Sequence, residues 1–297
     1  MPLDVVRRLL TPLRDPVATS RYPDAPPLLQ PATRGLPEID PLRCDRSGAC
    51  ASVCPTQAIQ AVETVWSIDA GRCIFCGECA AACPQEAIRM GSRVELAGLG
   101  RTDLVERIEL APTAGSAQAV HSSTAEPSPS GAYPGASSAD HVRSRLTHRL
   151  GRSLHVRHLD AGSCNGCDWE IAALLNPYHD VQRLGIDFVA SPRHADLLLV
   201  TGVMTRNLEE AARRTFEAMP EPRLVVAVGA CGISGGVFAG SATARGGAAG
   251  TLPVDVFVPG CPPRPEALIE GLLMAVEGRR RAAGQLRRGS RPGSVGS

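Results

Sequence analysis

The cysteines of this chain constrain its fold more than any other feature, because most of them occur in short, repeated spacings. One run has spacings of two, two and three residues and ends in proline; it contains Cys73, Cys76, Cys79 and Cys83. The odd total of eleven cysteines and these CxxC and CP spacings argue against a disulfide framework. Thiolates at such spacings can hold a metal centre from a tight turn. The pattern therefore predicts metal-bound cysteines in a reducing cytoplasm.

The same spacing occurs once more upstream, with a serine at the second position. This second run consists of Cys44, Ser47, Cys50 and Cys54. The repeat extends past the cysteines, because residues 55–59 (PTQAI) match residues 84–88 (PQEAI). Both runs are therefore explained by an internal duplication of one turn–helix unit.

This CxxCxxCxxxCP pattern resembles bacterial ferredoxins, in which three cysteines of one run bind one iron–sulfur cluster and the fourth binds the other. We call the first cluster the one expected on Cys44, Cys50 and Cys83, with Ser47 at the remaining position. The second cluster is the one expected on Cys54, Cys73, Cys76 and Cys79. Isolated CxxC pairs would suit zinc, but zinc leaves the proline-terminated runs unexplained. We expect a two-cluster ferredoxin domain over residues 38–92, which residues 93–110 close with strands.

Ser47 makes the first cluster unusual. A hydroxyl ionises far less readily than a thiol, and oxygen is a harder ligand than sulfur. The first cluster is therefore expected to be either a [3Fe–4S] cluster, favoured on oxidation, or a labile [4Fe–4S] cluster with serine oxygen or water at one iron. The second cluster is expected to be an ordinary [4Fe–4S] cluster.

After residue 150, apolar segments alternate with helical ones, which is typical of a mostly parallel sheet with helices on its faces. The expected strands are Leu154–Leu159, Ile186–Ala190, Leu197–Thr201, Leu224–Val228 and Val254–Val258. The expected helices are Asp168–Leu175, Asn207–Met219 and Pro265–Glu277. The chain is thus an α/β protein with a preceding α+β ferredoxin domain.

The remaining segments complete the expected organisation. Residues 111–140 lack the large apolar side chains needed for order, so they read as a flexible linker that lets two domains fold separately. Leucines near arginines in residues 1–15 indicate either an amphipathic helix or a frayed terminus. The expected division is an N-terminal arm (1–37), ferredoxin domain (38–110), linker (111–150), α/β domain (151–278) and arginine-rich tail (279–297).

Four cysteines of the α/β domain follow its expected strands. They are Cys164 and Cys167 after the first, Cys231 after the fourth and Cys261 after the fifth. Sites in such sheets form beyond the carboxyl ends of the strands, so the connectivity brings all four to one edge. Neighbouring glycines let backbone N–H groups approach and donate to cluster sulfurs. An iron–sulfur cluster and a four-cysteine zinc site both fit, and the fused ferredoxin domain favours the cluster.

Four motifs of this domain resemble the small subunit of group 4, membrane-bound energy-converting [NiFe]-hydrogenases. They equally resemble the homologous subunit of respiratory complex I that holds its terminal cluster. The motifs are residues 163–168 (SCNGCD), 191–196 (SPRHAD), 235–238 (GGVF) and 258–266 (VPGCPPRPE). The resemblance implies a flavodoxin-like fold, a terminal [4Fe–4S] cluster on the four cysteines, and a large subunit that holds the active site.

One departure separates the two branches of this family. Complex I subunits typically have adjacent cysteines where Asn165 and Gly166 separate Cys164 from Cys167, which favours the hydrogenase branch. The expected function is electron transfer from ferredoxin-type clusters to the terminal cluster of a membrane-associated, formate hydrogenlyase-like hydrogenase. The alternative is a B-type subunit of a complex I-like NADH/ferredoxin:quinone oxidoreductase. A zinc-stabilised interaction protein is the third interpretation.

The resemblance also implies partners and a location. The expected partners are a large catalytic subunit, the membrane subunits of the complex, and a soluble ferredoxin or a formate dehydrogenase module. A net charge of +1 gives no reason to expect a nucleic-acid partner, and nothing favours a homo-oligomer. No apolar run approaches the length of a membrane span, and the first residues lack a signal peptide's apolar segment. We expect a peripheral protein on the cytoplasmic face of the cell membrane.

A few charged residues near these motifs have two interpretations each. Asp168 and Glu170 either carry protons or tune charge beside the cluster, or are first-turn acids stabilised by the helix dipole. Arg193 and His194 either contact the large subunit or lie on a surface loop. The arginine-rich tail either touches anionic lipid or is solvated and disordered.

Overall fold

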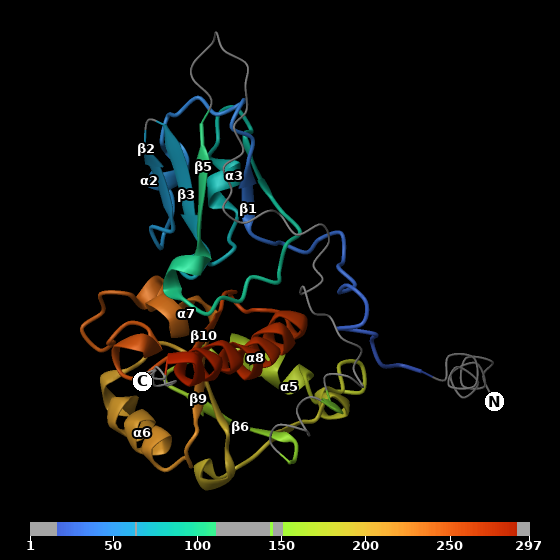
Figure 1. The fold of residues 1–297 in the computed structure, drawn as a ribbon. Coiled ribbons are helices and arrows are strands. Elements are labelled where there is room, and N and C mark those ends of the chain that lie inside the picture. The colour runs from blue at the N-terminus through green and yellow to red at the C-terminus, as the bar shows by residue number, and fades with distance from the viewer. Residues whose placement is uncertain (1–16, 63, 111–142, 145–150, 290–297) are drawn as a thin grey trace, which may run out of the picture.

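The computed structural model describes residues 17–62, 64–110, 143–144 and 151–289, and it describes side chains up to residue 277. A ferredoxin-type domain is stacked on an α/β domain (Figure 1). The helix expected in residues 1–15 and the linker expected in residues 111–140 lie outside the described residues. None of the described helices is long and apolar enough to cross a membrane.

The ferredoxin-type domain contains two small antiparallel sheets and two one-turn helices. Strands β1 (Pro37–Ile39) and β4 (Ile88–Met90) form one sheet. Strands β2 (Ile59–Val62), β3 (Val65–Asp69) and β5 (Val105–Glu109) form the other in the order β2–β3–β5. The helices are α2 (Ala49–Ser52) and α3 (Glu78–Ala81). The strand expected after residue 93 is therefore β5, which follows the 3-10 helix η1 (Arg101–Leu104).

The backbone repeats the duplication seen in the sequence. A left-handed glycine precedes each helix, Gly48 with φ 71° and Gly77 with φ 86°. Two further pairs of equivalent residues also have positive φ, namely Arg46 with Phe75 and Gln57 with Glu86. Because residues other than glycine adopt this conformation rarely, its recurrence at matching positions indicates that both cysteine runs follow the same path.

The α/β domain is built on a five-stranded parallel sheet in the order β10–β9–β8–β6–β7. The strands are β6 (Leu154–Asp160), β7 (Ile186–Phe188), β8 (Leu197–Thr201), β9 (Leu224–Val228) and β10 (Val256–Val258). Counted along the chain this order is 2-1-3-4-5, which is the flavodoxin-like arrangement. The fold class expected from the sequence is confirmed.

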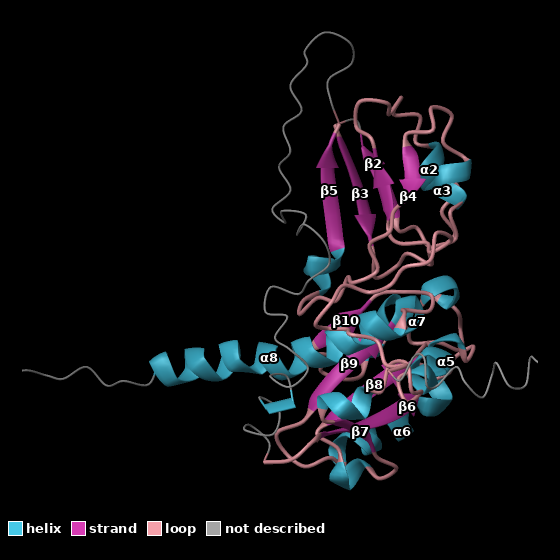
Figure 2. Cartoon of the chain, turned by 90° about the vertical axis from the view of Figure 1, so that its right-hand side faces the viewer, coloured by secondary structure: helices cyan, strands magenta, loops and turns pink. Residues whose placement is uncertain are grey.

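Helices cover both faces of this sheet (Figure 2). They are α5 (Gly166–Ala173), α6 (Arg206–Glu217), α7 (Gly229–Ser234) and α8 (Pro265–Gly289). Side chains of α5 and α8 share one core with Leu197, Leu199 and Val226. Those of α6 and α7 share another with Leu198 and Val225, because successive strand residues point to opposite faces.

Two helices differ from the expectation. Helix α7 was not expected from the sequence, because five of its six residues are small and they show no helical periodicity. Helix α8 continues past Glu277 to Gly289, so the first part of the arginine-rich tail is helical. Arginine, alanine and glutamine are good helix formers, and residues 266–291 contain no proline, so nothing stops the helix at residue 278.

The described parts of the two domains are in contact. Gly98 and Phe257 exchange backbone hydrogen bonds of 3.0 and 2.9 Å across the boundary. The core that includes Trp66 and Leu104 of the ferredoxin-type domain continues into Ile233 and Phe257 of the α/β domain. The two domains therefore pack on each other directly.

Candidate iron–sulfur centres

The four cysteines of the α/β domain lie at the carboxyl edge of its sheet. Cys164 and Cys167 are at the turn from β6 into α5, Cys231 is in α7 directly after β9, and Cys261 follows β10. Cys167 lies close enough to the other three thiols to interact with them electrostatically. This is the grouping expected from the order of the strands.

Glycines make this grouping sterically feasible. At Gly229, whose φ is 77°, a Cβ atom would lie 2.7 Å from the Cys167 sulfur. At Gly236, whose φ is 53°, a Cβ atom would lie 3.0 Å from the Cys231 sulfur. The backbone of α7 and of the turn after it therefore approaches the thiols more closely than any residue with a side chain allows.

The environment of these thiols suits a cationic centre. Burial raises the pKa of Cys167 strongly, and the neighbouring thiols add to the increase. Burial and nearby thiols raise the pKa of Cys231 to about 11, and burial, together with Cys164 and Cys76, raises the pKa of Cys261. Buried thiolates that repel one another need positive charge between them, which iron supplies when the ligands lose their protons.

A polar network fixes the turn that carries Cys164 and Cys167. Asp168 accepts hydrogen bonds from Ser163 Oγ at 2.6 Å and from Thr201 Oγ1 at 2.9 Å. His158 Nε2 lies 3.1 Å from Asp168 Oδ1, and burial lowers the pKa of this histidine. Asp168 therefore ties the cysteine turn to β6 and β8, a role beyond the helix dipole. Sequence reasoning missed His158 and Thr201, whose only signal is their position near strand ends.

The other charged candidates lie in different places. Glu170 is on α5, and burial raises the pKa of its carboxyl while Arg264 opposes the increase. Arg193 and His194 are exposed in the 3-10 helix η3 (Pro192–His194). Because η3 precedes β8, these two residues lie at the amino ends of the strands, opposite the four cysteines.

The ferredoxin-type domain gathers the cysteines expected for the second cluster. Cys73 interacts electrostatically with Cys79, Cys54 and Cys76. Two backbone N–H groups already point at these sulfurs: Ala58 N donates to Cys54 at 3.2 Å and Phe75 N to Cys73 at 3.4 Å. Such N–H···S bonds stabilise charge on a bound cluster, so this donor set fits one.

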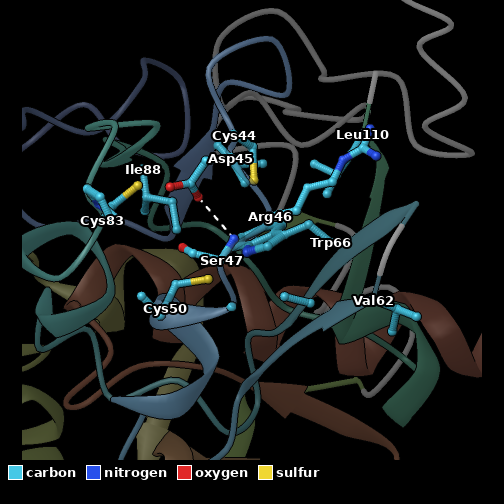
Figure 3. A pocket seen from close by; sticks show the side chains of 15 residues that line it. Cys44, Asp45, Arg46, Ser47, Cys50, Val62, Trp66, Cys83, Ile88 and Leu110 are labelled. Atoms are coloured by element: carbon cyan, nitrogen blue, oxygen red, sulfur yellow. Dashed lines mark hydrogen bonds between the residues drawn. The ribbon is translucent and has the colours of Figure 1, made fainter. Parts of the chain in front are cut away.

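The cysteines expected for the first cluster surround a cavity of about 290 Å³ (Figure 3). Cys50 interacts electrostatically with Cys44 and Cys83, and Ala87 N donates to the Cys83 sulfur at 3.2 Å. Ser47 lines the same cavity. The structure therefore brings together the three thiols and the serine that the duplicated motif places at one cluster.

The spacing of these groups bears on the zinc interpretation. Among the residues that the structure describes, no three His, Cys, Asp or Glu side chains are placed to hold a single metal ion. In a [4Fe–4S] cluster each thiolate can bind a different iron, which requires the thiols to be further apart. The repeated cysteine spacing of the sequence is the feature that favours clusters over single ions.

Comparison with known proteins supports this interpretation. Residues 164–275 match the NADH ubiquinone oxidoreductase 20 kDa subunit family, and residues 43–87 match a 4Fe-4S dicluster domain. A probable membrane-bound hydrogenase subunit of Pyrococcus furiosus is 49% identical over 133 residues, which are 45% of this chain and 80% of that protein.

Two further relatives represent both expected branches. Formate hydrogenlyase subunit 7 of Escherichia coli is 44% identical over 46% of this chain and 53% of its own length. The B-type subunit of an NADH-quinone oxidoreductase from Desulfovibrio desulfuricans is 46% identical over 37% of this chain and 60% of its own length. This chain thus spans little more than half of these two relatives, and the matched part covers less than half of this chain.

These findings confirm the resemblance, the fold class and the [4Fe–4S] cofactor type expected from the sequence. The chain belongs to the NADH:ubiquinone oxidoreductase 20 kDa subunit family of iron–sulfur oxidoreductase subunits, with a 4Fe–4S dicluster domain in the same polypeptide.

Proposed function

We propose that this chain is an electron-transfer subunit of a membrane-bound, energy-converting hydrogenase. Cys164, Cys167, Cys231 and Cys261 would hold the terminal cluster, and the two ferredoxin-type sites would hold the first and second clusters. Bound clusters supply one-electron transfer; the chain's own residues set the positions and the charge around them.

The order of the three thiol groups carries this proposal. Cys79 of the second site interacts electrostatically with Cys50 of the first. Cys76 of the second site interacts in the same way with Cys261 of the terminal site. Electrons from a soluble ferredoxin or a formate dehydrogenase module would therefore enter at the first site and leave through the terminal site.

Exposed apolar side chains beside the terminal site support docking of a large subunit there. Trp169 and Leu175 follow Cys167 and are 76% and 52% exposed. Val237 and Phe238, in the 3-10 helix η4 (Gly236–Phe238) after Cys231, are 53% and 49% exposed. Clustered exposed apolar residues mark interaction surfaces, and a large subunit at this place would receive the electrons.

The hydrogenase branch is favoured by the spacing of the first two cysteines. Asn165 and Gly166 lie between them, and Asn165 adopts a left-handed conformation with φ 66°. The second candidate function is a B-type subunit of a quinone reductase, because the corresponding NADH-quinone oxidoreductase subunit from Desulfovibrio desulfuricans also matches the chain. In both cases the chain would sit on the cytoplasmic face of the membrane with membrane subunits of the complex.

Cysteine replacement in the purified complex tests the proposal. Cys167→Ser or Cys261→Ser should remove the electron paramagnetic resonance (EPR) signal of the terminal cluster and abolish hydrogen turnover, because each supplies one ligand. The matched control, Cys50→Ser, should change only the signal of the first cluster. Full hydrogenase activity in Cys167→Ser or Cys261→Ser would refute the assignment.

The partner decides between the two candidate functions. Nickel in the purified complex, with hydrogen oxidation by an artificial acceptor, supports the hydrogenase. A nickel-free complex that reduces quinone supports the second candidate.

A further inference from the structure

Trp66 is a buried hydrogen-bond donor beside the first cluster site. It lies on β3 and is 1% exposed. Its Nε1 atom is buried and has no hydrogen-bond partner among the residues that the structure describes. An indole N–H can only donate, so a buried one without an acceptor is destabilising.

The indole lines the cavity that Cys44, Ser47, Cys50 and Cys83 surround (Figure 3). Trp66 and Cys50 also belong to the same buried core. The indole lies close enough to the Cys50 thiol to interact with it, although its Nε1 makes no hydrogen bond of standard geometry with the sulfur. An acceptor that carries negative charge inside the cavity would satisfy it.

We propose that Trp66 Nε1 donates a hydrogen bond to a sulfur of the first cluster, either Cys50 Sγ or a cluster sulfide. This inference rests on the proposal that Cys44, Cys50 and Cys83 hold a cluster. A hydrogen bond to sulfur stabilises the more negative, reduced state and therefore raises the reduction potential. Trp66 is a positioning and tuning residue in this role, since it transfers no electron itself.

The hydrogen bond from Trp66 has a functional consequence. An oxygen ligand from Ser47 is harder than a thiolate and favours oxidised iron, which lowers the potential of the first cluster. The Trp66 hydrogen bond acts in the opposite direction. It therefore makes the first cluster easier to reduce.

The chain offers a direct test because Trp66 and Trp169 are its only tryptophans. The complex is produced with ¹⁵N-indole tryptophan, and the first cluster is identified as the EPR signal that Cys50→Ala removes. Pulsed EPR on that signal should detect a ¹⁵N coupling. The matched control Trp169→Phe should keep the coupling, because Trp66 is then the only labelled tryptophan of this chain, and Trp66→Phe should lose it.

The reduction potential provides a second readout. The midpoint of the first cluster should shift downward in Trp66→Phe, while those of the second and terminal clusters stay unchanged. A first-cluster signal without ¹⁵N coupling in the labelled protein overturns the inference, as does an unchanged midpoint in Trp66→Phe. If Trp66→Phe fails to bind the cluster, the labelled native protein and Trp169→Phe decide alone.

The test separates this inference from the function on which it rests. If Cys44, Cys50 and Cys83 hold no paramagnetic cluster in any redox state, the inference is overturned together with that ligand assignment. The signals of the second and terminal clusters then show independently whether the electron-transfer function stands.

Discussion

Ser47 is the residue at which the duplicated cysteine motif lacks a thiol. It lines the cavity of the first cluster site, and its backbone N–H donates to Asp45 Oδ1 at 3.0 Å. This bond lies within the loop that leads into α2. Ser47 therefore lies where a ligand is expected, but its hydroxyl is a poor ligand for cluster iron.

We predict that the first cluster converts to a [3Fe–4S] form on oxidation, because the iron next to Ser47 is weakly held. Anaerobic purification followed by oxidation should give a three-iron EPR signal, which Ser47→Cys should abolish. Ser52→Cys is the control, since it adds a thiol to α2 that does not line the cavity. Two oxidation-resistant four-iron clusters in the native domain would contradict the prediction.

Glu270 is a partly buried carboxyl at the contact between the two domains. Its Oε2 atom accepts a hydrogen bond from Ala97 N at 3.3 Å. Burial, reinforced by the nearby Glu95, raises the pKa of Glu270 to about 8. Glu95 is itself partly buried against Tyr22, which donates a 2.5 Å hydrogen bond to it, and desolvation raises the pKa of Glu95.

This raised pKa makes stability depend on pH. An unfolded glutamate loses its proton near pH 4.3, whereas Glu270 keeps it to about pH 8 in the folded chain. Between these pH values the folded state therefore binds more protons than the unfolded state. The stability that protonated Glu270 contributes is lost as the pH rises through this range. The free energy of unfolding falls by at most about 1.4 kcal/mol per pH unit because of this group.

Glu270→Gln should remove this dependence, because the amide can still accept from Ala97 N and never ionises. Its unfolding midpoint, measured anaerobically, should exceed that of the native chain by a margin that grows from pH 5 to pH 8. Glu210→Gln on the exposed face of α6 is the control and should follow the native pH profile. A margin independent of pH would rule out the buried carboxyl as its cause.

At the scale of elements, the turn from β9 into α7 shapes the terminal site. Gly229 and Gly240 both have positive φ, 77° and 82°, but their surroundings differ. A Cβ at Gly229 would meet the Cys167 sulfur at 2.7 Å, whereas a Cβ at Gly240 would meet nothing within 4 Å. An alanine at either position has the same backbone strain, of about 1–2 kcal/mol.

Gly229→Ala should therefore lose or distort the terminal cluster, while Gly240→Ala should only lower stability. Iron content and EPR of the purified chain check this, and the first and second clusters serve as internal references. A native terminal signal in Gly229→Ala would mean that the backbone can move away from Cys167 without affecting the site.

At the scale of the whole molecule, the two domains are connected by the polypeptide and are also in direct contact. The sequence of residues 111–140 predicts that protease cuts there first, which leaves coloured fragments of about residues 38–110 and 150–280. Because Gly98 and Phe257 bond across the boundary, the fragments should stay associated after the cut. Size-exclusion chromatography and denaturing gels check both points. Uniform resistance of residues 111–140 would show that this segment is packed.

The sequence by itself determined the parts that depend on local spacing. The duplicated cysteine runs and their ferredoxin pattern predicted which thiols group together, with three positions of one run joined by the last cysteine of the other. The order of strands and helices predicted the flavodoxin-like sheet and its edge of four cysteines, because parallel strands end on the same side. Strands β8 and β9 have the expected bounds, since runs of buried apolar residues define them.

Only the tertiary structure decided what depends on contacts between distant segments. The approach of Cys76 to Cys261, the position of Trp66 beside Cys50, and the burial of Glu270 against Ala97 join residues with no local pattern in common. Side-chain burial and domain packing determine these contacts, and the spacing of residues along the chain does not predict them. The order of the three centres along the molecule therefore follows from how the two domains pack, whereas each centre's ligands follow from the sequence.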